Sequence, residues 1–121
     1  MDAVTYPSFR YDEGSTYMSL LLGIETSSKY YSIVLADENE VIFDSSTNLT
    51  EETHQDLSHL LTQGLTSINQ QIQDIQRIAV DVGPGSLSTI RVGVSFANAL
   101  AFSLQKPILA VPSFDMMTYE V

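Results

Sequence analysis

Residues 77–93 read RIAVDVGPGSLSTIRVG, and this stretch decides the fold. It begins with a near-continuous apolar run at 77–82 that contains β-branched residues, which predicts a central buried strand. Glycines and a proline at 83–85 end the strand. Ser86 is the expected N-cap of a helix over 86–104. A strand that turns through glycines into a helix is typical of an α/β protein.

Three shorter apolar runs come earlier in the chain, at 19–24, 30–36 and 41–45. Short polar turns separate them, which predicts a β-meander. Residues 107–111 predict a last strand. The expected order is β-β-β-α-β-α-β, an α/β fold in which helices pack on a mixed five-stranded sheet.

The first helix is expected to follow Thr50, since a threonine cap before Glu51 and Glu52 is typical of a helix start. The glutamine-rich segment 69–73 is ambiguous. Apolar residues at helical spacing form one stripe of this helix: Leu57, Leu60, Leu61, Leu65 and Ile68.

Composition limits the function classes. The chain has 121 residues, 15 acidic and 5 basic residues, a net charge of −10 and no cysteine. We expect a polar tail at 1–17, which is not a signal peptide, and a single lobe at 18–121. The apolar stretch 92–104 is too short and too polar for a membrane span, so we expect a soluble, cytoplasmic protein. The acidic balance argues against a stand-alone nucleic-acid binder, and the lack of cysteine excludes thiolate chemistry.

An anion or nucleotide site is one hypothesis for the glycine segment, because a helix N-terminus presents free backbone N–H groups. The polar turn after the first strand adds hydroxyl groups. The candidates are Thr26, Ser27, Gly83, Gly85 and Ser86. The sequence is neither a dinucleotide fingerprint nor a P-loop. The alternative is a sharp turn with local Ser/Thr hydrogen bonds.

Carboxylates at strand ends raise a second hypothesis. Glu25 ends the first strand and Asp81 nearly ends the fourth, so neighbouring strands would bring them together for Mg²⁺. The acids Glu51, Glu52 and Asp56 could join them. The alternative is a hydrogen-bonded strand residue, and we expect no metal centre, with Glu25 and Asp81 as weak candidates only.

Nucleophilic and histidine chemistry is not supported by the sequence. His54 and His59 are five residues apart and do not share a helix face, so a metal pair is not expected. No serine has an evident base partner, and we expect no catalytic residue.

Apolar helix residues have two interpretations, core packing or a helix–helix interface with a partner. Small residues at Gly93, Ala97, Ala99 and Ala101 would allow close packing. The interface candidates are Leu57, Leu61, Leu65, Ile90, Val94 and Ala97.

Three segments match one known family in order and spacing: GIETSS at 23–28, THQDLSHLL at 53–61 and VGPGSLSTIRVG at 82–93. The chain resembles the TsaB (YeaZ) proteins of tRNA threonylcarbamoyladenosine (t6A) biosynthesis over residues 18 to about 115. It differs at Glu25, where Asp is usual, at Leu87, where the family has Phe, and at Ser88-Thr89, where the family has Thr-Gly. These changes weaken the case for a nucleotide site.

The resemblance implies an actin/Hsp70-like (ASKHA) lobe with an RNase H-like core, of which the family carries a second copy that this chain lacks. It implies a non-catalytic accessory subunit with no cofactor of its own. The partners it implies are a TsaD-type subunit, which transfers the threonylcarbamoyl group to tRNA, and a TsaE-type ATPase. ATP and Mg²⁺ would enter only through these partners. Helix-mediated pairing with TsaD or with a second copy is expected, without direct nucleic-acid or membrane contact.

Two alternatives of other classes stay open. One is an RNase H-like metal-dependent nuclease that uses Glu25 and Asp81 with Mg²⁺. The other is a nucleotide-binding ASKHA lobe with its own turnover.

Overall fold

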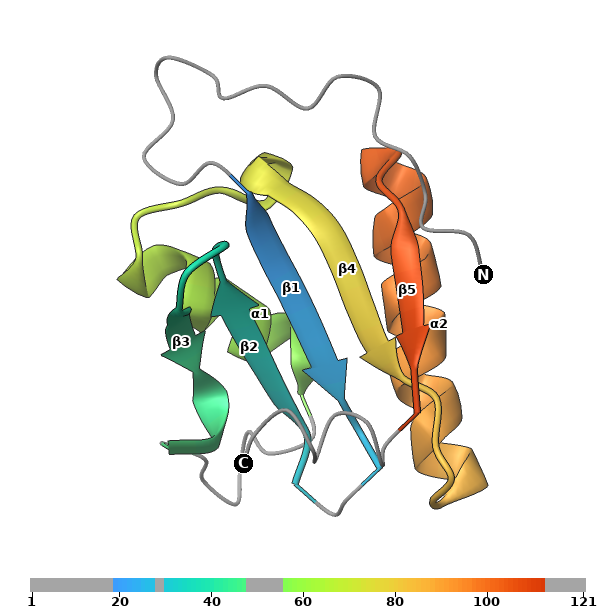
Figure 1. Cartoon of the computed structure of the whole chain (residues 1–121). Coiled ribbons are helices and arrows are strands. Elements are labelled where there is room, and N and C mark those ends of the chain that lie inside the picture. Colours follow the sequence, from blue (N-terminus) through green and yellow to red (C-terminus); the bar gives the residue numbers. More distant parts are fainter. Residues whose placement is uncertain (1–18, 28–29, 48–55, 113–121) are drawn as a thin grey trace.

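The computed structural model describes residues 19–27, 30–47 and 56–112 (Figure 1). The predicted tail at 1–17 lies outside these ranges. Single 3₁₀ turns occur at Ser45–Thr47 and Ile72–Asp74. The main elements are β1 (Leu20–Glu25), β2 (Ser32–Ala36), β3 (Val41–Asp44), α1 (Leu57–Ser67), β4 (Ile75–Asp81), α2 (Leu87–Leu104) and β5 (Ile108–Val111).

The five strands form one mixed sheet in the order β3-β2-β1-β4-β5. The meander β1-β2-β3 is antiparallel, and β4 and β5 run parallel to β1. The predicted order of elements and the mixed five-stranded sheet are therefore confirmed.

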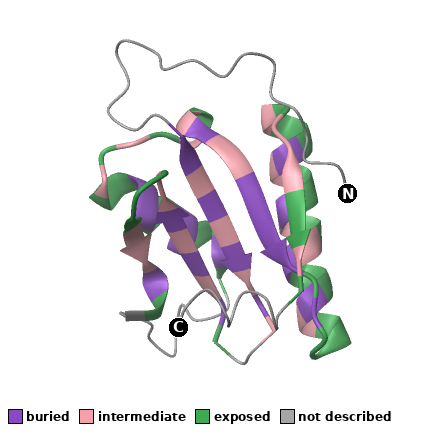
Figure 2. Cartoon of the chain, viewed as in Figure 1, coloured by how far each residue is buried: buried purple, intermediate pink, exposed green. Residues whose placement is uncertain are grey.

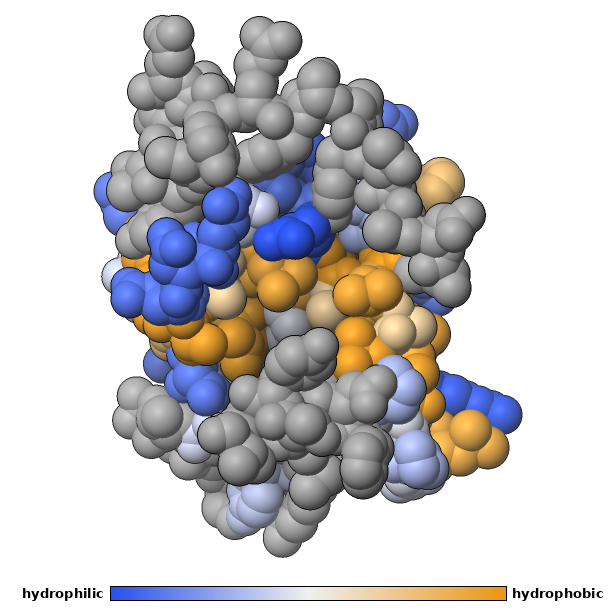
Figure 3. All heavy atoms as spheres, in the orientation of Figure 1, coloured by the Kyte–Doolittle hydropathy of each residue, from blue (hydrophilic) through white to orange (hydrophobic). Residues whose placement is uncertain are grey.

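Both helices pack on the same face of the sheet, behind it in Figure 1. Residues of β1 alternate between buried and half-buried along the strand (Figure 2). Leu20, Leu22 and Ile24 share one hydrophobic cluster with the buried residues of α1 and α2. The alternate side chains of β1 point to the opposite face, where Figure 3 shows apolar surface across the middle of the sheet.

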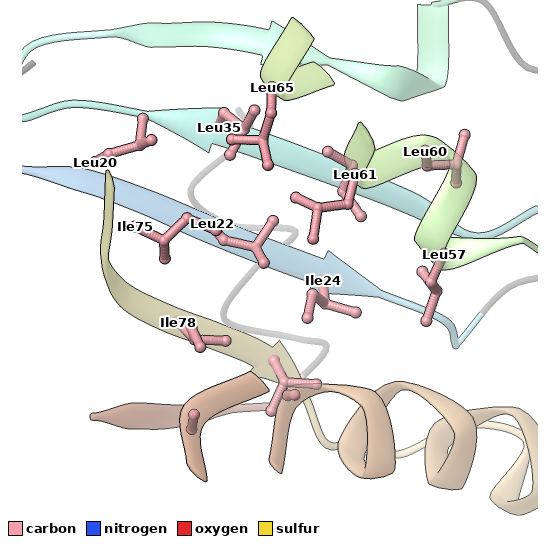
Figure 4. Packing of buried hydrophobic residues seen from close by; sticks show 14 of the residues in the cluster. Leu20, Leu22, Ile24, Leu35, Leu57, Leu60, Leu61, Leu65, Ile75 and Ile78 are labelled. Atoms are coloured by element: carbon pink, nitrogen blue, oxygen red, sulfur yellow. The ribbon is translucent and has the colours of Figure 1, made fainter. Parts of the chain in front are cut away.

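Helix α1 begins later than its sequence predicts. Its N-cap is Asp56, whose carboxylate accepts a hydrogen bond from the backbone N–H of His59 at 3.0 Å. Thr50 is therefore not the cap of this helix. Thr50, Glu51, Glu52 and His54 lie outside the described residues. The leucine stripe is confirmed, and Figure 4 shows Leu57, Leu61 and Leu65 beside the sheet residues.

Helix α2 approaches the sheet through small residues. Gly93, Ala97 and Ala101 are buried on its inner face, one turn apart. A Cβ atom at Gly93 would lie 2.5 Å from Thr26 Oγ1, so the helix can come this close to β1 only with glycine there. Ser86 occupies the N-cap position as predicted, although its side chain makes no capping hydrogen bond.

Within the described ranges, α2 is the one helix long and apolar enough to cross a membrane, judged by length and composition alone. It lies along β4 and buries one face against the sheet, which is the packing of a helix in a folded α/β domain.

Candidate functional site

Two polar loops meet at the C-terminal edge of the sheet. Because β1 and β4 are parallel neighbours, with Ile24 opposite Val80, the turn after β1 lies beside the glycine loop after β4. A Cβ atom on Gly85 would lie 3.2 Å from Ser27 Cβ. We call residues 25–27 and 81–86 together the junction.

The junction brings together several residues of the predicted anion site, but the chain itself already uses the hydrogen-bond donors of three of them. The backbone N–H and the hydroxyl of Ser27 both donate to Glu25 Oε1 at 2.5 Å. The backbone N–H of Gly83 donates to Asp81 Oδ1 at 2.9 Å. The buried Thr26 hydroxyl donates to the carbonyl of Thr89 at 2.6 Å.

The other two anion-site candidates, Gly85 and Ser86, are exposed. The hydroxyls of Ser86 and Ser88 lie 3.2 Å apart within hydrogen-bond distance of each other. An external anion would therefore compete with the carboxylates of Glu25 and Asp81 for the hydrogen-bond donors of Ser27 and Gly83. Ser86 is exposed at the rim of the junction. Binding at this site stays a prediction.

Glu25 and Asp81 are brought together as neighbouring strands predict. Asp81 is wholly buried, and its carboxyl group lies close to that of Glu25. Burial, and after it the neighbouring Asp81 carboxyl group, raises the pKa of Glu25, while the bonds from Ser27 partly offset the rise.

The junction does not assemble a metal centre from the residues that the structure describes. No group of three or more histidine or acidic side chains gathers anywhere in that part of the chain. Asp56, the described helix acid that could have joined Glu25 and Asp81, instead caps α1. Asp81 is buried and accepts a hydrogen bond from the Gly83 N–H, as in the hydrogen-bonded alternative considered for this residue.

A groove lies between the start of α1 and the outer side of α2. Opposite charges stand on its walls, Asp56 from the α1 cap and Arg91 from α2. Leu57, Val92 and Phe96 add apolar surface, and Ser58 and Ser95 complete the lining.

The six residues predicted for a helix interface need correction. Leu57, Leu61, Leu65, Ile90 and Ala97 are buried in this chain, each 7% exposed or less, and Val94 packs against the same core. They hold the helices on their own sheet, so a partner cannot reach most of their surface. Their spacing predicts an apolar face correctly but does not say what covers it.

The exposed apolar residues lie elsewhere on α2. Phe102 is 87% exposed, Leu87 65% and Val92 43%. Arg91 is the one charged residue in this 18-residue helix. Sequence reasoning missed Val92 and Phe102 as surface residues. The glycine and alanines at 93, 97 and 101 are the signal that could have found them, because close packing assigns that small face to the sheet.

Comparisons with known proteins agree with this architecture. The family model described as "TsaD: tRNA N6-adenosine threonylcarbamoyltransferase" matches residues 47–121. The chain belongs to the TsaB/TsaD family. Among curated relatives, it is 34% identical over 97 residues to the tRNA threonylcarbamoyladenosine biosynthesis protein TsaB of Bacillus subtilis. A tRNA N6-adenosine threonylcarbamoyltransferase of Anaplasma phagocytophilum is 32% identical over 107 residues.

A solved structure confirms the TsaB (YeaZ) resemblance and the predicted fold class. YeaZ from Pseudomonas aeruginosa superposes with a TM-score of 0.67 and 28% identity over 78% of this chain. The chain spans less than half the length of its TsaB/TsaD relatives: 42% of the Bacillus subtilis TsaB and 31% of the Anaplasma phagocytophilum transferase. It covers 43% of the YeaZ chain.

Proposed function

We propose that this chain is a non-catalytic partner subunit in the t6A modification of tRNA. It pairs with a TsaD-type catalytic subunit through the outer side of α2 and the adjoining start of α1. The observation that carries this proposal is the solvent-facing side of α2, where apolar side chains lie exposed beside one charged residue.

The chemistry of this surface suits another protein. An exposed helix face is ordinarily polar. On α2 the exposed face carries the apolar residues Val92 and Phe102, and the small residues Ser95 and Ala99 lie between them along the helix. Exposed apolar surface beside polar groups is typical of a protein–protein interface. The groove extends this surface to α1 and supplies Asp56 and Arg91 for charged contacts at its rim.

The junction supports a role without chemistry of its own. Its two carboxyl groups lie close together, and they accept hydrogen bonds from the amide and hydroxyl of Ser27 and from the amide of Gly83. The net charge of −10 opposes direct binding to tRNA, so the partner would supply the basic contacts. A TsaE-type ATPase would bring ATP and Mg²⁺ to the assembly, and a cytoplasmic location follows from this role.

The test is the molar mass of the full chain in solution, measured by light scattering with and without a TsaD-type subunit. We expect a heterodimer that forms at the expense of any homodimer. Phe102→Asp should abolish the heterodimer because it places a charge on the exposed apolar face. Val41→Asp is the matched control, since Val41 is 60% exposed on β3, away from the helix surface.

A monomer that ignores TsaD would contradict the proposal. If Phe102→Asp and Val41→Asp lost heterodimer formation equally, the loss would not be specific to α2, and the contact with the partner would lie elsewhere or both variants would be unfolded. The nuclease alternative then predicts cleavage of an RNA–DNA hybrid that is lost in Asp81→Asn. The nucleotide-binding alternative predicts ATP binding that a bulky replacement of Gly85 removes.

A further inference from the structure

One face of the sheet has no covering layer among the described elements. Both helices pack on the face that carries Leu22 and Ile78, behind the sheet in Figure 1. A strand with parallel neighbours on both sides, as β4 has in β1 and β5, is ordinarily buried on both faces. A second layer is therefore expected on the front of the sheet.

The front of the sheet is apolar, and we call it the open face. Its residues alternate with the core residues along the strands, and the strand register places them side by side. Figure 3 shows the apolar surface across its middle. The open face consists of Leu21, Gly23, Val34, Ala36, Ala79 and Leu109.

Arg77 stands beside the open face as the one cation in the described strands. The register places it opposite Leu21, and it precedes the core residue Ile78, so it shares the side of the open face. Its Nε atom is buried and has no hydrogen-bond partner in the described part of the chain. Because an unpaired buried donor is unfavourable, Arg77 suits an acidic group that arrives with the second layer.

The segment that follows β5 has a sequence that suits this layer. Residues 113–121 read SFDMMTYEV and lie outside the described ranges. Phe114, Met117 and Val121 have the spacing of one apolar helix stripe. Glu120 comes three residues after Met117, which puts it on the flank of that stripe. The segment therefore combines an apolar face with a carboxylate at its edge.

The length of this segment matches the distance to Arg77. Val111 lies opposite Asp81 at the C-terminal edge of the sheet, four residues along β4 from Arg77. Four strand residues span about 13 Å, and a nine-residue helix over 113–121 is also about 13 Å long. A helix that runs back across the open face would therefore bring Glu120 close to the level of Arg77.

We propose that residues 113–121 form a helix that packs its apolar stripe on the open face and pairs Glu120 with Arg77. The pair gives the guanidinium group a carboxylate partner, in a place that the apolar stripe shields from water. The segment covers the side of the sheet opposite to α1 and α2. This inference does not depend on the proposed partner role, which uses the outer side of α2.

The experiment is paramagnetic relaxation enhancement, measured by NMR on the full chain. The chain has no cysteine, so Tyr119→Cys provides a single site for a nitroxide label. Position 119 lies on the side of the proposed helix away from its apolar stripe, so the label leaves the contact intact. We expect the amides of Leu21 and Ala79 to lose most of their intensity, while those of Ser95 and Phe102 on the outer side of α2 keep theirs.

Two results would overturn the proposal. Without selective broadening of the open face, its cover would have to be residues 1–17 or another protein. If a labelled chain broadened the open face of an unlabelled, nitrogen-15-enriched chain, the cover would be a second copy.

Charge exchange tests the pair of Arg77 and Glu120. Glu120→Arg should weaken the broadening of the open face, and Arg77→Glu in the same chain should restore it. Arg91→Glu makes the matched change on the outer side of α2 and should not restore it. Restoration by both changes, or by neither, would refute the pair. If the chain with Arg77→Glu does not fold, Glu120→Arg decides alone, since unchanged broadening would refute the pair.

Discussion

Gly93→Ala tests the close approach of α2 to β1. In an isolated helix this change is stabilising by about 1 kcal/mol, since alanine is the better helix former. Here the added Cβ atom would lie 2.5 Å from Thr26 Oγ1 and 3.2 Å from Thr26 Cγ2. Thr26 is wholly buried and its hydroxyl is bound to the carbonyl of Thr89, so it has little room to move.

The magnitude follows from three contributions. Overpacking of a tight interior costs about 1–3 kcal/mol, and disruption of the Thr26 hydrogen bond costs about 1 kcal/mol more. The gain in helix propensity offsets about 1 kcal/mol. We therefore expect a net loss of about 2 kcal/mol in the free energy of unfolding. For a urea m-value of about 1.5 kcal/mol/M, the midpoint should fall by about 1.3 M.

The assay is equilibrium urea unfolding of the wild type, Gly93→Ala, Thr26→Ala and the double variant. Thr26→Ala removes both atoms that the new methyl group would strike first, so the double variant should lose less than the sum of the single losses. Ser95→Ala, on the exposed side of the same helix, controls for propensity and should be neutral or slightly stabilising. A more stable Gly93→Ala would refute the close-packing argument.

Three further outcomes are expected. Asp56→Ala should lower the free energy of unfolding by about 1 kcal/mol through loss of the α1 cap, measured by thermal unfolding, and an unchanged midpoint would contradict the cap. The pKa of Glu25 is raised from its ordinary value of 4.5, so wild-type stability should fall as pH rises from there through the folded-state pKa. Glu25→Gln should flatten that slope in urea unfolding across pH, and a parallel slope would show that other groups cause it. Phe102→Asp should change stability by less than about 0.5 kcal/mol because the side chain is 87% exposed, and circular dichroism would expose a larger loss.

The order of the elements could be predicted because periodicity and glycines mark each one. The apolar runs at 19–24 and 77–82 are shorter than a typical helix, and their apolar residues are continuous and not spaced at helical intervals. Both runs form buried strands. The start of α1 could not be fixed, since Thr50 and Asp56 are both good capping residues by type. Only the packed structure selects Asp56, at the point where the leucine stripe meets the sheet.

The candidate site was predictable in place but not in its bonding. Glu25 and Asp81 stand at the ends of two predicted strands, which suggested that they would meet if the strands were neighbours. The strands β1 and β4 are parallel neighbours, so both carboxylates lie at the same edge of the sheet. That the Glu25 carboxylate would accept both hydrogen bonds from Ser27 depends on rotamers and burial, which a sequence does not contain. The helix surface was misassigned for a related reason: Leu61 and Phe102 look alike in a hydropathy pattern, yet one is 4% and the other 87% exposed.

If α2 tilted where it meets Thr26, the close contact at Gly93 would be the pivot. Gly93 sits in the second turn of α2, and roughly 16 Å of helix extend from it to Leu104. A tilt of about 5° at the pivot would swing that far end by about 1.4 Å, by the geometry of a rigid rod. Phe102 lies near that far end, so any such tilt would displace the exposed apolar surface of α2.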